Sequence, residues 1–512
     1  MNQNNISAAE LFQRVRELLM LPELEPQTRN KMMHDTLILC CHEGVKDTKQ
    51  AFGNLFSQVD YLCKARGIKV ADKIAIQTMR RHSNSQEPLS GEDLKYDARA
   101  LALFISAVFG VDVPHELNVL IPHTPRPYQK GLEINNRRIR CIVKNWDGDF
   151  IRVDIDQDAD EEEYLVQLKD EENHIDHTYL WDILKEGMQL NLLDCQVKQP
   201  IITPRLIVVE PDYLVDISSI ATCFTDFGHH PLLYLLNLMK PRANTQATLL
   251  GNFAGAALDD IINSHGKYQM NETVKTNFRE KALEFCTCPW FDPKKFYTDA
   301  SLQAFNLQQV VDILFPRTAP QAQMTAFRGE SLYDRKKAIL EPSFVCEALG
   351  IQGRVDLMTT DCKLLVEQKS GRNMNIETHQ VDPGYHSYQL EPHYVQLLLY
   401  YGVLQHNFKL SNDRVNIRLL YSKYRPQDGL MVVAYYQKLF KEAIQYRNQL
   451  VAASFEIAKE GFEHALNEFT PEVLNVAGTQ DFFYNKYLKP QIEAITKPLH
   501  TLCLLYTSDA AD

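Results

Sequence analysis

Successive stretches of the chain differ in the spacing of their apolar residues. In residues 1–118 apolar residues recur every three or four positions, as in AAELFQRVRELLM and DARALALFISAVFGV, which predicts amphipathic helices. From about 125 to 212 the period shortens towards two, and RRIRCIVKNWDGDFIRVDID alternates around a WDGD turn as a β-hairpin does. Further short apolar strands follow closely, so we expect a small β-barrel of the OB type over 119–212.

The second half of the chain mixes both periods. LLGNFAGAALDDIIN and HYVQLLLYYGVLQ predict helices, whereas QGRVDLM, KLLVEQK and VNIRLLYSKY predict strands. This mixture over 213–440 predicts an α/β domain, and residues 441–502 predict a further helical stalk or linker. Residues 503–512, CLLYTSDAAD, resemble translated adapter sequence and are left out of the fold. The expected fold class is therefore α/β with an N-terminal helical region and a small OB-like barrel.

Composition predicts a globular protein without membrane-spanning segments. Hydrophobic residues make up 45% of the 512 and charged residues 23%, which is ordinary for a soluble chain of several domains. No apolar run approaches the ~20 residues needed to cross a bilayer. The N-terminus has neither the basic start nor the apolar block of a secretory signal, so we expect a cytoplasmic protein.

The net charge of −12 is concentrated in one segment. Asp154 to Asp176 contains eleven acidic residues and one basic residue, which gives −10, and the last ten residues contribute −2. Since −12 + 10 + 2 = 0, the remaining chain is balanced, and local basic patches on a neutral body can bind nucleic acid. The candidate patches are Arg137–Arg140 and Lys369–Arg372, and a solvated surface is the alternative for each.

The strongest candidate for chemistry is GIQGRVDLMTTDCKLLVEQKSG, residues 350–371. Asp356 lies on one predicted strand, TTDCK makes a turn, and alternation on the next strand sets Glu367 and Lys369 on one face, with Gln368 pointing away. A hairpin brings Asp356 alongside them. Two carboxylates suit Mg²⁺ or Mn²⁺, which activates a bound water and stabilises charge on a phosphate. Lys369 can orient that water or offset charge in the transition state.

The spacing of these three residues is common, and a surface strand with a Glu–Lys pair is the alternative. The context favours a site. VEQK lies within an apolar strand, where a Glu and a Lys on one face need compensation. Gln396 and Tyr400 are four residues apart, and therefore on one face of the following predicted helix.

These motifs together resemble the RecB-type branch of the PD-(D/E)XK nucleases, and most closely the helicase–nucleases of DNA replication and end resection. GIQGRVD resembles the family segment that ends in a metal-binding Asp, and EQKSG resembles its ExK-T/S-G. HYVQLLLY resembles its HxxQxxxY, with His393, Gln396 and Tyr400. RNQLV (Arg447–Val451) resembles the end of its nuclease region, and RLIVVEPDYLVDISSIATC the join between its barrel and its nuclease. The resemblance covers about 125–455.

The resemblance implies a restriction-endonuclease-like nuclease core over 213–440 that cleaves single-stranded or flap DNA with Mg²⁺ or Mn²⁺. The residues it assigns to catalysis are Asp356, Glu367, Lys369, Gln396 and Tyr400. The metal ligands would be Asp356, Glu367 and the backbone carbonyl of Gln368. Glu341 is an additional candidate ligand, with an ordinary strand-edge carboxylate as the alternative. The candidate DNA contacts are Arg354, Ser370, Arg372 and His393.

One departure concerns the metal ligands. The family has a metal-binding His in its first nuclease helix, where this chain has Gly255 in LLGNFAGAALDD. Asn252, Asp259 and Asp260, on neighbouring turns, are the candidates to replace that ligand, and the sequence does not choose among them.

A second departure concerns iron–sulfur chemistry. Many relatives hold a cluster on one upstream and three downstream cysteines. Cys223 matches the upstream position, but no cysteine follows Cys362 until Cys503 in the adapter-like tail. There is also no CxxC in the chain, so we expect no iron–sulfur cluster and no zinc ribbon.

Three function hypotheses follow. The first is the N-terminal nuclease module of a helicase–nuclease in DNA replication, recombination or repair, with a helicase domain in cis beyond this chain. No GxxxxGK[ST] occurs, so this chain is not expected to bind ATP through a P-loop. The second is a DNA-binding scaffold with a degenerate site, and the third a stand-alone nuclease of the CRISPR-adaptation or phage-defence kind. The barrel would guide a single strand, with Trp146 and Phe150 stacking on bases or filling the barrel core.

Overall fold

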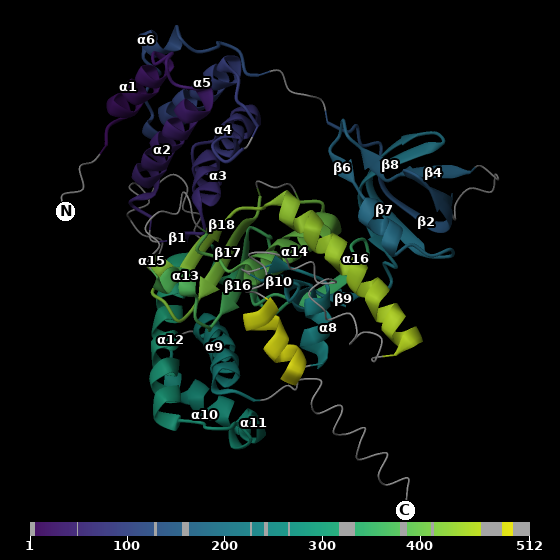
Figure 1. The fold of residues 1–512 in the computed structure, drawn as a ribbon. Helices are drawn as coiled ribbons and strands as arrows, with labels where there is room; N and C mark the ends of the chain where they lie inside the picture. Colours follow the sequence, from purple (N-terminus) through teal and green to yellow (C-terminus); the bar gives the residue numbers. More distant parts are fainter. Residues whose placement is uncertain are drawn as a thin grey trace, which may run out of the picture.

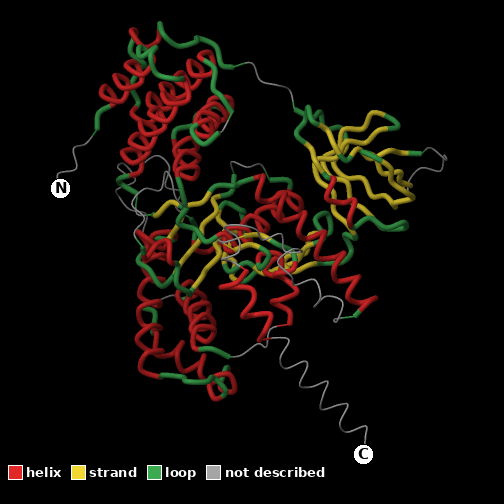
Figure 2. Tube along the Cα trace, viewed as in Figure 1, coloured by secondary structure: helices red, strands yellow, loops and turns green. Residues whose placement is uncertain are grey.

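The computed structural model describes most of the chain, and the structural statements below concern its described residues. These are 6–48, 50–85, 87–126, 131–155, 163–225, 228–239, 244–264, 267–316, 333–378, 387–410, 414–461 and 484–494. The adapter-like tail and Cys503 lie outside them. Figures 1 and 2 show a helical bundle, a small barrel and a central sheet flanked by helices. The expected mixture of helices, sheet and a small barrel is thereby confirmed.

The N-terminal region forms a helical bundle, drawn in purple and blue in Figure 1. Ser7 and Glu10 form a capping box that starts the first helix. The helices bury their apolar faces against one another. Their bounds are α1 (Ala8–Leu19), α2 (Pro26–Val45), α3 (Leu55–Ala65), α4 (Val70–His82), α5 (Gly91–Phe109) and α6 (His115–Asn118).

The helical region also contributes a strand to the central sheet. Its short strand β1 (Ala51–Phe52) pairs in parallel with the sheet strand β18 (Leu430–Val433). Gln50 accepts a hydrogen bond from Arg418 at 2.7 Å. Two residues are too few for the hydrophobic period to indicate a strand, so the sequence pattern gave no sign of this pairing.

The expected barrel is present, and its described strands close in the order β2-β3-β4-β8-β7. The predicted hairpin is β2–β3, turning at Gly148, whose φ of 55° favours glycine. Ile139, Cys141 and Val143 alternate into the barrel interior. Trp146 packs partly against the same interior. The strand bounds are β2 (Asn136–Asp147), β3 (Phe150–Ile155), β4 (Tyr164–Gln167), β7 (Gln189–Lys198) and β8 (Ile201–Val209).

Short elements accompany the barrel strands along the chain, and Ile175 and Leu180 among them pack in the barrel's apolar cluster. These elements are β5 (Lys169–Asp170), β6 (Ile175–Asp176), the 3-10 helix η1 (Thr178–Asp182) and β9 (Val215–Asp216). β9 joins β14 (Ile351–Arg354) and β13 (Ser343–Cys346) in a small sheet.

Among the described residues, six strands form the central sheet in the order β1-β18-β17-β16-β15-β12. β12, β15 and β16 are antiparallel neighbours, and the helix α14 (Glu391–Phe408) then crosses over to β17, which runs parallel to β16. The bounds not yet given are β12 (Ala338–Leu340), β15 (Leu357–Thr359), β16 (Leu364–Lys369) and β17 (Asn416–Tyr421).

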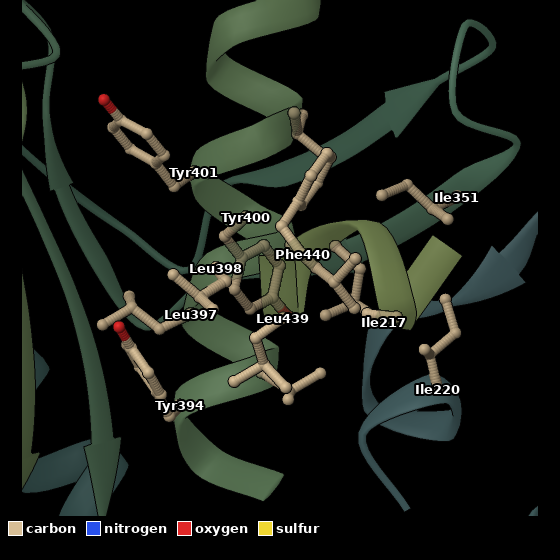
Figure 3. Packing of buried hydrophobic residues seen from close by; sticks show 14 of the residues in the cluster. Ile217, Ile220, Ile351, Tyr394, Leu397, Leu398, Tyr400, Tyr401, Leu439 and Phe440 are labelled. Carbon is tan, nitrogen blue, oxygen red and sulfur yellow. The ribbon is translucent and has the colours of Figure 1, made fainter. Parts of the chain in front are cut away.

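Helices cover both faces of this sheet. Leu364 and Val366 of β16 pack in a cluster with α9 (Gln246–Asn263) and α12 (Pro293–Leu314). Leu365 packs on the opposite face, in the cluster that holds α14, α16 (Gln437–Glu460) and α7 (Ile217–Ala221). Figure 3 shows part of this second cluster, with Tyr400 of α14 and Phe440 of α16. The alternation of β16 therefore gives each face its own helical layer.

The remaining described elements connect these layers. Their bounds are β10 (Phe224–Thr225), β11 (Gly228–His229), α8 (Leu232–Met239), α10 (Met270–Glu280), α11 (Ala282–Cys286), α13 (Met374–Glu377), α15 (Pro426–Gly429), and the short helices η3 (Arg335–Lys337) and η5 (Tyr484–Leu488). None of the helices in the described part of the chain is long and apolar enough to cross a membrane.

The helix α16 joins the barrel to the central sheet. Arg447 is fully buried and donates hydrogen bonds to the carbonyls of Gly350, Val209, Glu210 and Tyr213. Residues 441–460 are helical, as expected of a stalk or linker, and Arg447 fixes this helix to the barrel and to the turn at Gly350. The one-sided apolar period that predicted the helix cannot tell a free stalk from a helix held by one buried arginine. Most of 461–502 lies outside the described residues.

Candidate functional site

The hairpin β15–β16 brings Asp356 and Glu367 together. Leu357 pairs with Val366 across the two strands, and the same antiparallel register sets Asp356 opposite Glu367. Asp356 lies in the break between β14 and β15, one residue before the strand begins. Its Oδ2 accepts a hydrogen bond of 2.6 Å from the backbone N–H of Gln368. The two carboxyl groups therefore sit side by side at one end of the sheet.

Glu367 is almost completely enclosed, with 2% of its surface exposed. Its Oε1 accepts a hydrogen bond of 2.7 Å from Lys369 Nζ. Its Oε2 is buried and has no hydrogen-bond partner in the described structure. A buried carboxylate oxygen without a partner is costly, so the site retains one unused acceptor position.

Gln396 and Tyr400 of α14 connect the two strands from the side. Lys369 Nζ donates to Gln396 Oε1 at 2.9 Å, and a side-chain hydrogen bond links Gln396 to Tyr400. The Tyr400 hydroxyl donates to the carbonyl of Arg354 at 2.6 Å. These contacts link Glu367, through Lys369, Gln396 and Tyr400, to the carbonyl of Arg354, two residues before Asp356. Gln396 and Tyr400 therefore hold the hairpin in position.

Tyr400 can reach that backbone because residue 353 is a glycine. A Cβ added at Gly353 would lie 3.0 Å from both the Tyr400 ring and its hydroxyl. Such a distance is tighter than ordinary van der Waals contact, so a side chain here would press the ring away. The glycine of GRVD thus serves close packing beside the site.

Asp259 is the residue of α9 that approaches the pair. Its carboxyl interacts electrostatically with Asp356 and Glu341. Asp260 instead accepts a hydrogen bond of 2.5 Å from Thr273 of α10, and Asn252 is exposed. Of the three candidates that the sequence left open, Asp259 is therefore the one near the site.

Gly255 lies one helical turn before Asp259, on the same face of α9. A Cβ added at Gly255 would meet nothing within 4 Å. A Cβ added one turn earlier, at Gly251, would lie 3.2 Å from the Ser370 hydroxyl. This face of α9 therefore borders the end of β16 and leaves open space beside it.

Glu341 and Arg354 form an ion pair at the rim. Arg354 Nη1 lies 3.1 Å from Glu341 Oε2, and both side chains are substantially exposed. Glu341 has a φ of 47°, a left-handed conformation that is uncommon outside glycine. Its backbone N–H donates to the carbonyl of Asp356 at 3.0 Å. The turn at Glu341 is thereby fastened to the site, and such outliers often accompany function.

Burial and mutual repulsion raise the pKa of all three carboxyl groups. Burial, then the Asp356 charge, raises the pKa of Glu367 to about 8. Burial, then Glu341, raises the pKa of Asp259 to about 7. Burial also raises the pKa of Asp356, against the opposing hydrogen bond from Gln368. Clustered carboxyls with raised pKa values are characteristic of sites that hold a cation or a proton.

The other predicted DNA contacts lie around this cluster rather than in it. Arg372 pairs with Glu377 on α13. Ser370 is half-buried at the end of β16. His393 Nδ1 lies 3.2 Å from the Tyr421 hydroxyl, and burial, reinforced by Lys369, lowers the pKa of His393 to about 3. His393 is therefore neutral near pH 7 and offers a phosphate no positive charge.

A polar network lies behind β16 and was not predicted from the sequence. Gln368 points away from Glu367, as predicted, and its Nε2 donates to Ser422 Oγ at 2.8 Å. Ser422 Oγ donates to Gln303 Oε1 at 2.5 Å, and Gln303 Nε2 donates to the carbonyl of Ser370 at 3.0 Å. The signal available was the presence of Gln303 and Asn306 on the buried face of an apolar helix, where they need partners.

The chemistry of the donor set suits a hard divalent cation. No group of three or more His, Cys, Asp or Glu side chains that could hold a metal occurs among the described residues. Mg²⁺ needs fewer, because it is usually bound through one or two carboxylates, waters and substrate phosphates. Asp356 and Glu367, with the unused Oε2, fit that requirement.

Neither a scan against protein-family models nor a search of curated proteins found a match to the chain.

Proposed function

We propose that the protein is a metal-dependent DNA nuclease of the PD-(D/E)XK kind, acting on single-stranded or flap DNA. The observation that carries this proposal is the buried Glu367 opposite Asp356, with Lys369 bonded to the same carboxylate and one Glu367 oxygen left without a partner. The order of elements supports it. β12, β15 and β16 are antiparallel neighbours, and α14 crosses over to the parallel strand β17, which is compatible with the α/β core expected for such a nuclease.

Each residue has a stated task in this proposal. Asp356 and Glu367 would hold Mg²⁺ or Mn²⁺, and Asp259 would add negative charge nearby. When bound, the metal would supply a water of lowered pKa and stabilise charge on the scissile phosphate. Lys369, held by Gln396, would donate hydrogen bonds to that water or to the phosphate oxygens. Gln368 anchors Asp356 through its N–H, so the pair is set before substrate arrives.

A DNA-binding scaffold is the second candidate. The observations that favour it are the glycine at 255, where the family has a metal-binding His, and the lack of three clustered ligand side chains in the described part of the chain. In this reading the hairpin keeps its fold and binds DNA without cutting it.

The two candidates separate in one assay. End-labelled single strands and duplexes with 5′ or 3′ tails would be incubated with the protein in Mg²⁺, Mn²⁺ or EDTA. The nuclease proposal expects cleavage that needs metal and is lost in Glu367→Ala, while Glu347→Ala, an exposed carboxylate in the same region, cleaves normally. If wild type and Glu367→Ala leave the substrate equally intact while both bind it, the scaffold replaces the nuclease.

A further inference from the structure

A cleft of about 700 Å³ lies between the barrel and the central domain, away from the carboxylate pair. Its walls come from β2, β7 and β8 of the barrel and from α14 and α16. Figure 1 shows α16 running beside this side of the barrel. The cationic side chains that line it are Arg137, Arg138, Arg205, Lys409 and Lys441.

The cationic side chains of the cleft outnumber the acidic ones, and Asp212, which pairs with Arg140, also interacts electrostatically with Arg138. Asp194 is the acidic residue among those that line it, and it pairs with Arg137 at 2.8 Å. In the described part of the chain, Arg138, Arg205, Lys409 and Lys441 make no ion pair with a carboxylate. Arg205 donates to the backbone carbonyl of Leu132 instead. Lys441 and Arg205 repel one another, and burial together with this repulsion lowers the pKa of Lys441.

Such an arrangement costs stability unless an anion offsets it. Like charges gathered in a concave, partly desolvated site raise the local potential and attract anionic ligands. The cleft is also partly apolar, since Ala348, Leu410 and Tyr435 line it and are only half-buried. A ligand that fits would therefore carry several negative charges and also offer apolar surface.

The helix α14 relates this cleft to the carboxylate pair. Gln396, in the N-terminal half of α14, contacts Lys369. His406, near the C-terminal end of the same helix, lines the cleft. Ten residues separate them, which corresponds to about 15 Å along the axis. One rigid helix thus connects the two places.

We propose that this cleft binds the backbone of a single nucleic-acid strand, as a second anchoring site remote from the carboxylate pair. A single strand carries regularly spaced phosphates and exposes bases that can lie against Leu410 and Tyr435. A duplex keeps its bases stacked inside and offers no such apolar surface. The proposal deepens the nuclease function and rests on it only for the identity of the substrate as DNA.

The test measures binding without cleavage. Fluorescent oligothymidylate would be titrated in EDTA into Arg138→Glu/Lys409→Glu, two exposed cleft residues. The matched control is Lys31→Glu/Arg152→Glu, which changes the charge equally at exposed positions outside the cleft. We expect the cleft variant to bind at least about ten-fold more weakly. For the cleft variant, the slope of log K against log salt concentration should become about 1.4 less negative. Each phosphate contact on a single strand contributes about 0.7 to that slope, and two contacts are lost. The control should bind as wild type does.

Equal loss in the cleft variant and the control would overturn the proposal, as would wild-type binding by the cleft variant. Competition by inorganic phosphate as effective as that by the strand, at equal phosphate concentration, would replace the strand with a small anion. Circular dichroism would confirm that each variant is folded. If the strand binds in the cleft but wild type does not cleave DNA with metal, the proposed nuclease function is wrong and the proposed binding site in the cleft is supported. If wild type cleaves DNA and the cleft variant binds the strand as wild type does, only the proposed binding site in the cleft is wrong.

Discussion

At the scale of single residues, the properties of the candidate site follow from placing acids where water is scarce. Glu367 is enclosed by an apolar strand and faces Asp356, so burial and the neighbouring charge raise its pKa and make its proton hard to remove. Lys369 bonds one oxygen and leaves the other unused. The pattern of alternation was sufficient to predict which of residues 367, 368 and 369 share a face.

This burial gives a pH dependence whose sign can be stated. The pKa of Glu367 is about 8 in the fold against an ordinary 4.5. Its protonated form therefore stabilises the fold fully below about 4.5, and that contribution is lost as the pH rises through about 8. Metal requires the deprotonated form, so added Mg²⁺ should raise Tm more at about pH 8.5 than at about pH 6.

Thermal denaturation in EDTA and in Mg²⁺ checks this expectation. Glu367→Gln should flatten the metal-free pH profile and remove most of the metal effect. A Tm increase that is equal at both pH values, or larger at the lower one, would contradict the role of Glu367 as a metal ligand.

The choice among the α9 carboxylates can be tested by two matched substitutions. Asp259→Asn should lower metal-dependent cleavage by about 10- to 100-fold, because Asp259 supplies charge beside Asp356. Asp260→Asn should leave the rate within about two-fold, because that side chain is bonded to Thr273. Initial rates at saturating Mg²⁺ decide the question. The reverse order of effects would assign the missing ligand to Asp260.

At the scale of elements, the strand and helix periods predicted the hairpin, α14 and the barrel strands, but not what fixes them. Tyr400 was expected on one face of a helix, and its hydroxyl in fact bonds the carbonyl of Arg354. The polar network of Gln303 and Ser422 behind β16 could not be predicted, because it joins residues far apart in the chain. The spacing of apolar residues predicts which face of a helix or strand a residue occupies. Its hydrogen-bond partners from distant segments depend on tertiary packing, which the spacing does not show.

Gly353 provides the test at this scale. Gly353→Ala should push on the Tyr400 ring, destabilise the fold by about 1–3 kcal/mol, and lower kcat by about ten-fold with little change in KM. Gly91→Ala is the control, since a Cβ there meets nothing within 4 Å. Steady-state kinetics and thermal denaturation measure both effects. Unchanged kcat in a folded Gly353→Ala protein would remove Tyr400 from the positioning of the hairpin.

At the scale of the whole molecule, one buried arginine joins parts that the sequence divided. Arg447 contacts carbonyls from the end of β8, from the following turn and from Gly350. A Cβ at Gly350 would collide with the Arg447 guanidinium, and the φ of 61° also favours glycine there. RNQLV was identified only as a motif, and its structural role could not be predicted. The carbonyls that Arg447 contacts lie more than ninety positions away in the chain.

Arg447→Ala should leave several buried carbonyls unsatisfied and destabilise the protein by about 3–5 kcal/mol. We also expect the barrel to melt separately from the central sheet, giving two transitions in calorimetry. Lys459→Ala, an exposed cation on the same helix, should leave the melting profile unchanged. A single transition at the wild-type temperature in Arg447→Ala would show that α16 does not join the two parts.

In the proposed reaction, Asp356, Glu367 and Lys369 cut a phosphodiester bond with a bound metal. Its most direct measurement is the single-turnover rate of cleavage of an end-labelled single strand in Mn²⁺. We predict that Lys369→Met lowers this rate by about 10²–10³-fold, and that Glu367→Gln lowers it at least as much. Both variants should bind the strand in EDTA as wild type does. Rates in both folded variants within about two-fold of wild type would contradict the account.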